Sequence, residues 1–291
     1  MNQEPIKVKL VGGLGNQLFI WATAFVISKK NHYSISFDAT ACQQWGCELE
    51  RFGIKIDIKP SYLSGVLPGK SSSNKTVDSV RFIRSKFRNL RIGKYYWERD
   101  SIFDPSIFLI KPGKVLCGYF QSYKYFIGFE NEIQRELIQG FQGGRDYIDL
   151  LNELDGSQWV AIHVRRQDYV LMSETFGLTS ETYFEESIRY VESLFPGVKK
   201  IAFSDDVTEA RKILPHCDMY IGHNELASSV ETLILMSNSS AIIGSNSSFS
   251  WWAAFLSNSP DDCKIFPEPW FRDESIDTSG LVPPTWQRIK N

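Results

Sequence analysis

Residues 161–169 follow an apolar stretch and contain one histidine, two adjacent arginines and one aspartate, namely His163, Arg165, Arg166 and Asp168. A guanidinium carries a planar fork of donors that matches phosphate oxygens, and such a charge-assisted pair is stronger than a neutral hydrogen bond. The cluster therefore suits a nucleotide diphosphate, with one arginine holding a leaving pyrophosphate. The alternative is a purely structural set of ion pairs at the end of a strand, with one arginine tied to Asp168.

A second polar group follows another apolar segment. Ser204 ends a predicted strand at residues 199–204, and Asp205 and Asp206 follow it directly. A ribose or a guanine edge is one ligand for these side chains, and capping of the next helix by an aspartate is the alternative. A Mg²⁺ site is disfavoured because adjacent carboxylates diverge.

A third group combines small polar residues with the start of a helix. Asn246, Ser247 and Ser248 stand between an apolar strand and an aromatic-rich helix that begins near Phe249. The N–H groups at a helix start carry partial positive charge and bind anions. A serine N-cap explains one of these residues, whereas the whole run favours a second anion site.

The fourth group is a glycine-rich loop, Gly-Gly-Leu-Gly-Asn-Gln, at residues 12–17. Gly13 permits close backbone approach, and Asn16 and Gln17 can exchange hydrogen bonds with a sugar or phosphate. Leu18 stands where a dinucleotide fingerprint requires its last glycine, and the chain has no P-loop sequence. A glycine-rich turn in a packed sheet is the alternative.

Alternating strands and helices must position these four groups. The first part of the chain predicts a strand, a helix and a strand at residues 6–11, 18–30 and 34–37. After a hydrophilic stretch at 139–156, predicted strands alternate with predicted helices. The strands are 159–164, 199–204, 218–221 and 241–244, and the helices are 180–195, 207–213, 228–237 and from 249 onwards. The pattern is typical of an α/β protein with two β/α domains, 1–156 and 157–291, and a cleft between such domains is a common ligand site.

Composition excludes several classes of protein. The net charge of −2 argues against bulk nucleic-acid binding, and no window reaches the ~20 apolar residues of a membrane span. Five scattered cysteines without a C-x-x-C pair and a polar amino terminus predict reduced thiols in a cytoplasmic protein. The basic stretch 81–94 is either a solvated helix face or a peripheral contact with the inner membrane or with an acidic partner.

Taken together and in order, these motifs resemble the bacterial α1,2-fucosyltransferases of glycosyltransferase family 11. The resemblance spans nearly the whole chain and rests on residues 12–19, 118–122, 125–126, 163–169, 203–206 and 246–252. It implies a GT-B-type fold with two Rossmann-like domains facing a cleft. Residues 157–291 would hold GDP-fucose, and residues 1–156 would form mainly the acceptor side.

The implied reaction is metal-independent and needs no cofactor beyond the donor substrate. L-fucose moves from GDP-fucose to the 2-hydroxyl of a terminal galactose, with inversion at the anomeric carbon. Acceptors implied by the resemblance are galactose-terminated oligosaccharides and lipid-linked glycans such as O-antigen units. A fucosyltransferase of another linkage, such as α1,6, or a non-catalytic carbohydrate-binding protein on the same fold are the alternatives.

The resemblance also assigns roles to residues. Arg165 is expected to contact the β-phosphate, Arg166 to support it, and Asp168 or Glu174 to act as general base. Arg165, Asp168 and Asn16 form the expected catalytic set, with Asn16 and Gln17 facing the sugar. The expected donor-binding residues are Gly13, Asn16, Gln17, His163, Arg165, Arg166, Ser204, Asp205, Asp206, Glu231, Asn246, Ser247, Ser248 and Phe249.

Two positions depart from the family pattern. Gln167 stands where the family usually has glycine, so the loop after the arginines must avoid strongly positive φ. Thr232 follows Glu231 where the family usually has a pair of acids. Glu231 is then the remaining acid for reading guanine.

Overall fold

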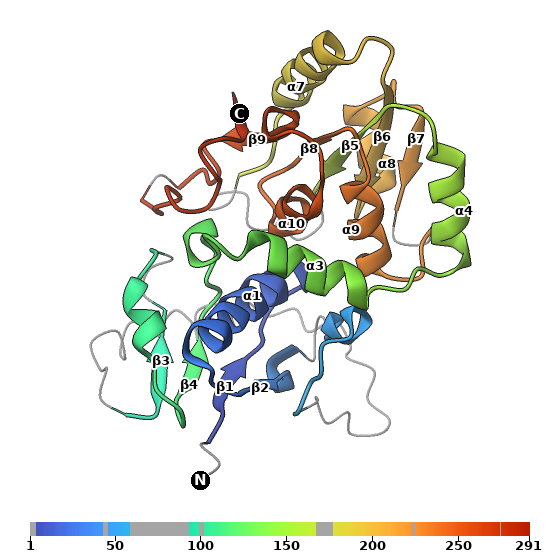
Figure 1. Cartoon of the computed structure of the whole chain (residues 1–291). Coiled ribbons are helices and arrows are strands. Elements are labelled where there is room, and N and C mark those ends of the chain that lie inside the picture. Colours follow the sequence, from blue (N-terminus) through green and yellow to red (C-terminus); the bar gives the residue numbers. More distant parts are fainter. Residues whose placement is uncertain are drawn as a thin grey trace. The chain divides into compact units, whose positions relative to one another are not determined.

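The computed structural model describes residues 4–42, 46–58, 93–98, 102–166, 177–222, 225–273 and 275–291. The chain divides into two compact units, Met1–Ile133 and Gln134–Asn291. Each unit contains one sheet, and the strands of each sheet pair in parallel (Figure 1). The α/β class and the two parallel-sheet units expected of a GT-B-type protein are therefore confirmed.

The first unit builds a four-stranded sheet in the order β2-β1-β4-β3. Its helices, 3-10 helices (η) and strands are β1 (Ile6–Lys9), α1 (Leu14–Asn31), β2 (Ile35–Asp38), η1 (Thr40–Cys42), η2 (Leu49–Phe52), β3 (Tyr95–Trp97), η3 (Pro105–Leu109), β4 (Val115–Cys117) and η4 (Tyr123–Tyr125). The strand–helix–strand unit predicted at the start of the chain is confirmed. Because β2 and β4 pair with opposite edges of β1, the strand order reverses between β1 and β4.

Helix α1 is buried on nearly every side. Leu18, Phe19 and Ile20 are all inaccessible to solvent, and burial continues to Ile27 except at one position. A helix that is apolar all round belongs in the interior of a protein. This packing holds the amino-terminal end of α1, and with it the glycine-rich loop, at the carboxyl end of β1.

The second unit builds a six-stranded sheet in the order β10-β9-β8-β5-β6-β7. Its elements are β5 (Trp159–Val164), α7 (Glu181–Leu194), β6 (Lys199–Ser204), α8 (Val207–Ile213), β7 (Met219–Ile221), α9 (Ser229–Ser237), β8 (Ala241–Ile243), α10 (Ser248–Leu256), η5 (Asp261–Cys263), β9 (Lys264–Glu268) and β10 (Gln287–Lys290). The predicted strands and helices up to α10 are confirmed. The sequence did not predict β9 and β10, because β9 contains Pro267 and β10 is a polar edge strand.

Side chains of β5 alternate between the two faces of this sheet. Val160, Ile162 and Val164 belong to a buried cluster that includes Tyr183 of α7. Since successive strand residues point to opposite faces, His163 points to the other face. The opposite orientation places His163 beside the start of α10.

Two amphipathic helices, α3 (Glu130–Gly140) and α4 (Arg145–Leu154), carry the chain into the second sheet. The N–H of Gly144 donates a hydrogen bond of 2.7 Å to Glu231 Oε1 in α9, and Tyr147 and Leu154 of α4 are buried. The glycine-rich stretch near residues 139–156 is therefore packed structure. The division between the units precedes it, whereas the sequence places the boundary after residue 156.

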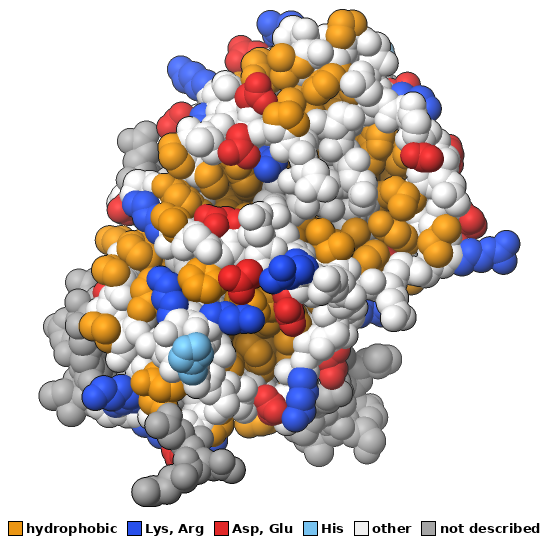
Figure 2. Space-filling model, in the orientation of Figure 1, with side chains coloured by type: hydrophobic (Ala, Val, Ile, Leu, Met, Phe, Trp, Pro, Cys, Tyr) orange, Lys and Arg blue, Asp and Glu red, His pale blue; other side chains and the backbone are white. Residues whose placement is uncertain are grey.

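The surface carries both signs of charge. On the face shown in Figure 2, lysine and arginine side chains are interspersed with acidic and apolar ones. Within the described ranges, no helix is both long and apolar enough to cross a membrane. The five cysteines are free thiols, and burial raises the pKa of Cys117 and Cys263 to about 11. These two thiols are therefore largely protonated at neutral pH, in the less reactive form.

Candidate functional site

The strand order of the second sheet reverses between β5 and β8. From β5, the sheet continues through β6 and β7 on one side and through β8, β9 and β10 on the other. Open α/β sheets bind ligands in the crevice at the carboxyl ends of the strands that flank such a switch point. The arginine run follows β5 and the serine run follows β8, so two of the predicted groups meet here.

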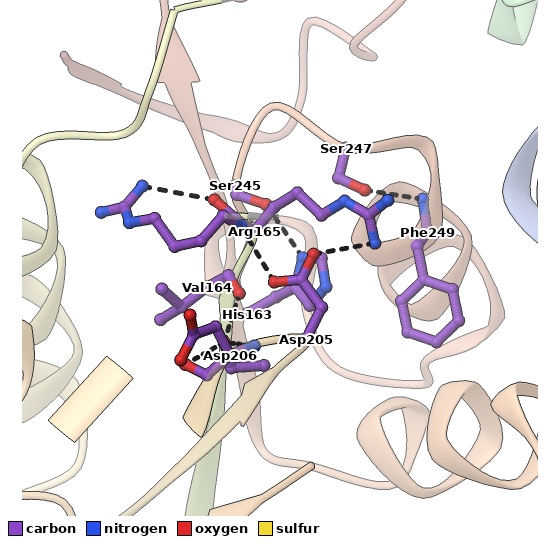
Figure 3. Close-up of polar contacts among 10 residues, drawn as sticks. His163, Val164, Arg165, Asp205, Asp206, Ser245, Ser247 and Phe249 are labelled. Carbon is purple, nitrogen blue, oxygen red and sulfur yellow. Dashed lines mark hydrogen bonds and ion pairs between the residues drawn. The ribbon is translucent and has the colours of Figure 1, made fainter. Parts of the chain in front are cut away.

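His163 joins the ends of these two strands. Its Nδ1 lies 2.9 Å from Ser245 Oγ, and its ring centroid lies 5.4 Å from that of Phe249 (Figure 3). His163 is 5% exposed and Ser245 is fully buried. The imidazole therefore fixes the loop after β5 to the start of α10, and its expected nucleoside contact stays a prediction.

Arg165 presents a positioned cation at the switch point. Its Nη1 lies 3.2 Å from Asp205 Oδ2, and the two side chains are 22% and 2% exposed (Figure 3). Asp205 Oδ1 accepts a second hydrogen bond, of 2.9 Å, from the backbone N–H of Arg166. The buried carboxylate therefore orients a guanidinium that solvent can still reach, which suits a diphosphate ligand.

Arg166 is held differently from its neighbour. It is 7% exposed, and its guanidinium donates to the carbonyl oxygens of Thr179 at 2.9 Å and of Arg165 at 3.3 Å. Burial lowers the pKa of Arg166 from its ordinary value, an effect that nearby carboxylates partly oppose. The contacts tie two chain segments together, which fits the supporting role expected of this residue.

Ser204 and Asp206 shape the turn between β6 and α8. Ser204 Oγ donates to the carbonyl of Val164 at 2.8 Å and accepts from the N–H of Asp206 at 3.0 Å. Asp206 Oδ1 accepts from the N–H of Glu209 at 3.0 Å and so caps α8. The helix-capping alternative is therefore confirmed for Asp206, and a nucleoside contact would have to use its other carboxylate oxygen.

The serine run forms the amino-terminal end of α10. Ser247 Oγ accepts from the N–H of Phe249 at 3.3 Å and caps the helix, while Asn246 Nδ2 donates to the carbonyl of Gly177 at 3.2 Å. Ser248 begins the helix, and the first turn contains no acidic residue. The partial positive charge of this helix end thus lies at the same switch point as the Arg165 guanidinium.

Glu231 lies in the first turn of α9 and is 4% exposed. Its Oε1 accepts the N–H of Gly144, the residue that precedes α4. The carboxylate therefore fastens α4 to α9. Its expected contact with guanine stays a prediction and would need the second oxygen of this carboxylate.

Gln17 of the glycine-rich loop holds the loop itself. It is 1% exposed, and its Nε2 donates to the carbonyl oxygens of Gly12 and Gly46, both at 2.8 Å. Both amide hydrogens are therefore used within the protein. A mostly apolar helix carries the side chain into the interior, and the expected sugar contact of Gln17 stays a prediction.

Asn16 points to a different partner. Gln121 Nε2 donates a hydrogen bond of 2.6 Å to Asn16 Oδ1, and both residues are half-buried. Gln121 follows β4, so this pair spans the switch point of the first sheet. Among the described residues, a Cβ added at Gly13 would meet nothing within 4 Å, which leaves open space at this point of the loop. Gln121 is not among the site residues expected from the sequence, although a polar residue shortly after a strand is a usable signal.

Some predictions fall outside the described residues. They concern Asp168 and Glu174 as general bases, Gln167 as a loop departure, and nearly all of the basic stretch 81–94. Within the described residues, no three histidine, cysteine, aspartate or glutamate side chains are grouped to hold a metal ion. The general base, the membrane contact and the absence of a metal requirement stay predictions.

Comparison with known proteins agrees with the sequence motifs. The family model described as glycosyl transferase family 11 matches residues 59–290. An α1,2-colitosyltransferase of Escherichia coli is 26% identical, over 98% of this chain and 99% of its own. The O-antigen biosynthesis glycosyltransferase WbnK of Escherichia coli is also 26% identical, over 95% and 98%. A galactoside 2-α-L-fucosyltransferase of Caenorhabditis elegans is 26% identical over 64% of this chain and 56% of its own.

Proposed function

Because the chain belongs to glycosyl transferase family 11, we propose that it is an inverting galactoside α1,2-fucosyltransferase that uses GDP-fucose. The observation that carries this proposal is the Arg165–Asp205 ion pair at the switch point of the second sheet. The 2-linkage is supported by relatives whose names specify α1,2 or 2-α transfer.

In this proposal the second unit holds the donor. The diphosphate lies between the Arg165 guanidinium and the amino-terminal end of α10, where Ser247 caps the helix. Both groups are held in place before substrate binds, by Asp205 and by the helix. Preorganised donors of this kind stabilise charge that develops in the transition state without further reorganisation.

The reaction breaks the bond between the fucose C1 and the β-phosphate oxygen of GDP. The 2-hydroxyl oxygen of galactose forms the new bond from the opposite face, so the anomeric configuration inverts. The hydroxyl proton passes to a base, predicted to be Asp168 or Glu174, and the negative charge passes to GDP. Arg165 offsets that charge, so we propose that no metal ion is required.

The first unit is proposed to bind the acceptor and the transferred sugar. Its switch point carries the amides of Asn16 and Gln121 in place of an arginine cluster. A galactose-terminated glycan, either free or lipid-linked, is the proposed acceptor, and similarity to an O-antigen biosynthesis enzyme supports a polysaccharide repeat unit. A cytoplasmic location beside the inner membrane belongs to the same proposal.

One observation favours a second donor. The relative that covers 98% of this chain is named as a colitosyltransferase. Colitose is the 3-deoxy counterpart of fucose, so GDP-colitose and GDP-fucose share the nucleotide that the second unit would hold. The two candidates differ in one sugar hydroxyl.

Sugar transfer from both donors to a panel of galactose-terminated acceptors tests the proposal. The assay contains excess EDTA, and NMR determines the linkage of the product. An α1,2-fucosylated product is expected. An α1,6 product or a strict preference for GDP-colitose would replace the proposed activity. Absence of any product, with sugar binding retained, would instead favour a carbohydrate-binding protein.

A further inference from the structure

We propose that Gln121 recognises a sugar hydroxyl and is a specificity-determining residue of this protein. The inference rests on the proposed function and adds a residue to it. The hydroxyl belongs either to the transferred sugar or to the acceptor galactose, and the chemistry required of the protein is the same in both cases.

The first argument is the position of Gln121 in the sheet. Strand β1 pairs with β2 on one edge and with β4 on the other. The loops after β1 and β4 therefore flank the crevice of the first sheet, just as the loops after β5 and β8 do in the second. Asn16 comes from the first of these loops and Gln121 from the other.

The second argument is the hydrogen bonding of the two amides. Gln121 Nε2 donates to Asn16 Oδ1 at 2.6 Å, which orients both side chains. Among the described residues, Gln121 Oε1 accepts no hydrogen bond, and the side chain is half-buried rather than flexible at the surface. An amide carbonyl held in this way can accept a hydrogen bond from a hydroxyl.

The third argument is backbone strain directly before Gln121. Phe120 has a φ of 52°, a region that bulky residues rarely adopt. Its ring is fully buried and packs edge-on against Tyr125, with centroids 5.9 Å apart. Such a conformation is unfavourable and persists where packing enforces it, often at functional sites. The strained residue directly precedes Gln121 in the loop that carries it.

The fourth argument is a second constraint on the same loop. Glu98, which follows β3, accepts a hydrogen bond of 2.7 Å from the N–H of Tyr119. At Gly118, an added Cβ would lie 2.4 Å from Glu98 Cβ, so only glycine allows this approach. The loop after β4 is thus held at Gly118, Tyr119 and Phe120, immediately before Gln121.

A rigid, neutral amide pair suits the recognition of hydroxyl groups. A site that hydrogen-bonds a substrate hydroxyl rejects the analogue that lacks it, because the polar group of the site is then left unpaired. Gln121 would therefore distinguish a sugar from its deoxy counterpart. The difference between fucose and colitose is of this kind.

The test compares Gln121→Met with Gln142→Met in the full chain. Methionine has nearly the shape of glutamine without its amide, and Gln142 is exposed in the loop before α4. We expect Gln121→Met to lower kcat/KM by about tenfold or more, with the melting temperature unchanged. Gln142→Met is expected to match the wild type. Gln121→Glu, which keeps the size and an acceptor oxygen, provides a second variant if methionine impairs folding.

Deoxygenated substrates identify the hydroxyl. The wild type, Gln121→Met and Gln142→Met are assayed with donors and acceptors that each lack one hydroxyl. For the hydroxyl that Gln121 reads, removal should impair the wild type but leave Gln121→Met with no further loss. Loss with a deoxy donor assigns the contact to the transferred sugar, and loss with a deoxy acceptor assigns it to galactose.

The proposal is overturned if Gln121→Met has the same kcat/KM as Gln142→Met. It is also overturned if every deoxy analogue lowers the kcat/KM of Gln121→Met by as much as it lowers that of the wild type. A wild type without transfer activity would instead contradict the proposed function. Binding of the same sugars, measured by saturation-transfer NMR, then tests Gln121 without turnover. Equal binding by the wild type and Gln121→Met would overturn the inference in that case.

Discussion

The two sheets place different chemistry at equivalent points of their topology. In the second unit, the switch point carries the Arg165 guanidinium and the amino-terminal end of α10. In the first unit, it carries the neutral amides of Asn16 and Gln121. The same architecture therefore offers an anion site in one unit and a hydrogen-bonding site in the other. The difference indicates which unit would hold a diphosphate and which would hold sugar hydroxyls.

The supporting residues of the two sites differ in the same way. Asp205, a buried carboxylate, orients Arg165 by charge. A strained backbone at Phe120 and the hydrogen bond between Glu98 and the N–H of Tyr119 hold the loop directly before Gln121. A charged group needs a counter-charge when it is partly removed from water, whereas a neutral amide only has to be oriented toward its hydrogen-bond partner. Substitutions at the two sites should therefore have different effects.

Arg165→Ala is expected to lower fucose transfer by about 10³-fold, because the charge of the leaving GDP loses its fixed cation. Arg165→Lys preserves a cation beside Asp205 but removes the planar fork, so most of the loss should remain while folding is maintained. Single-turnover kinetics with circular dichroism measures both. Wild-type rates in either variant would remove Arg165 from the mechanism.

Arg166→Ala is expected to act mainly on stability. It leaves the carbonyl oxygens of Thr179 and Arg165 without their donor, which costs about 2 kcal/mol. Urea unfolding followed by fluorescence measures this change. A variant of normal stability that lacks activity would instead make Arg166 the diphosphate contact, reversing the assignment of the two arginines.

Gly13→Ala and Gly12→Ala form a matched pair in the first unit. Among the residues that the structure describes, a Cβ at Gly13 meets nothing within 4 Å, whereas Gly12 has a φ of +76° and its Cβ would lie 2.5 Å from Asn16 Nδ2. Gly13→Ala should keep stability within about 0.5 kcal/mol but lower kcat/KM about tenfold by occupying the crevice. Gly12→Ala should cost about 1–2 kcal/mol of stability.

Thermal melting and kinetics of both glycine variants distinguish these effects. If Gly13→Ala has full activity, the open space at Gly13 is not occupied by substrate. In that case only the predicted loss of stability in Gly12→Ala would remain.

Ser247→Ala removes the cap of α10 and should cost about 1 kcal/mol, whereas Ser247→Gly should cost a few tenths. Both variants lack the hydroxyl. If the hydroxyl itself binds the diphosphate, GDP affinity measured by calorimetry should fall equally in the two. If GDP affinity falls only in Ser247→Ala, the cap supports GDP binding by holding the end of the helix, and the hydroxyl itself is not the contact.

The smallest expected effect concerns Asp38, at the end of β2. Burial raises the pKa of Asp38, but hydrogen bonds from Thr40 and the contact with Lys9 outweigh it, so the pKa lies below its ordinary value of 3.8. A carboxylate with a lowered folded-state pKa stabilises the fold above its unfolded value, and the contribution is lost as pH falls through the folded value.

Melting temperatures of the wild type and Asp38→Asn should therefore differ at neutral pH and converge below about pH 4. A constant difference across this range would assign the effect to packing. GDP binding should not change, because Asp38 belongs to the first unit, whereas the proposed diphosphate site lies in the second.

Much of the fold was predictable because its signals are local. The strands from β5 to β8 are apolar runs bounded by polar residues, and the helices between them follow the expected alternation. Strand β9 was not predictable in the same way, since Pro267 argues against a strand and only its pairing with β8 and β10 overcomes that preference. The two compact units divide between residues 133 and 134, before the glycines near α4, whereas the sequence pattern places the boundary after residue 156.

The sequence by itself determined which chemical groups are present and in what order: adjacent arginines after one strand, a serine run before a helix, and a glycine-rich loop with two amides. These depend on residue type and short-range periodicity. Only the tertiary structure decided that Arg165 is reachable while Arg166 is buried, that Gln17 points inward, and that Gln121 meets Asn16 across 105 positions of the chain. Exposure and long-range pairing depend on how the sheets pack, and no local pattern specifies that packing.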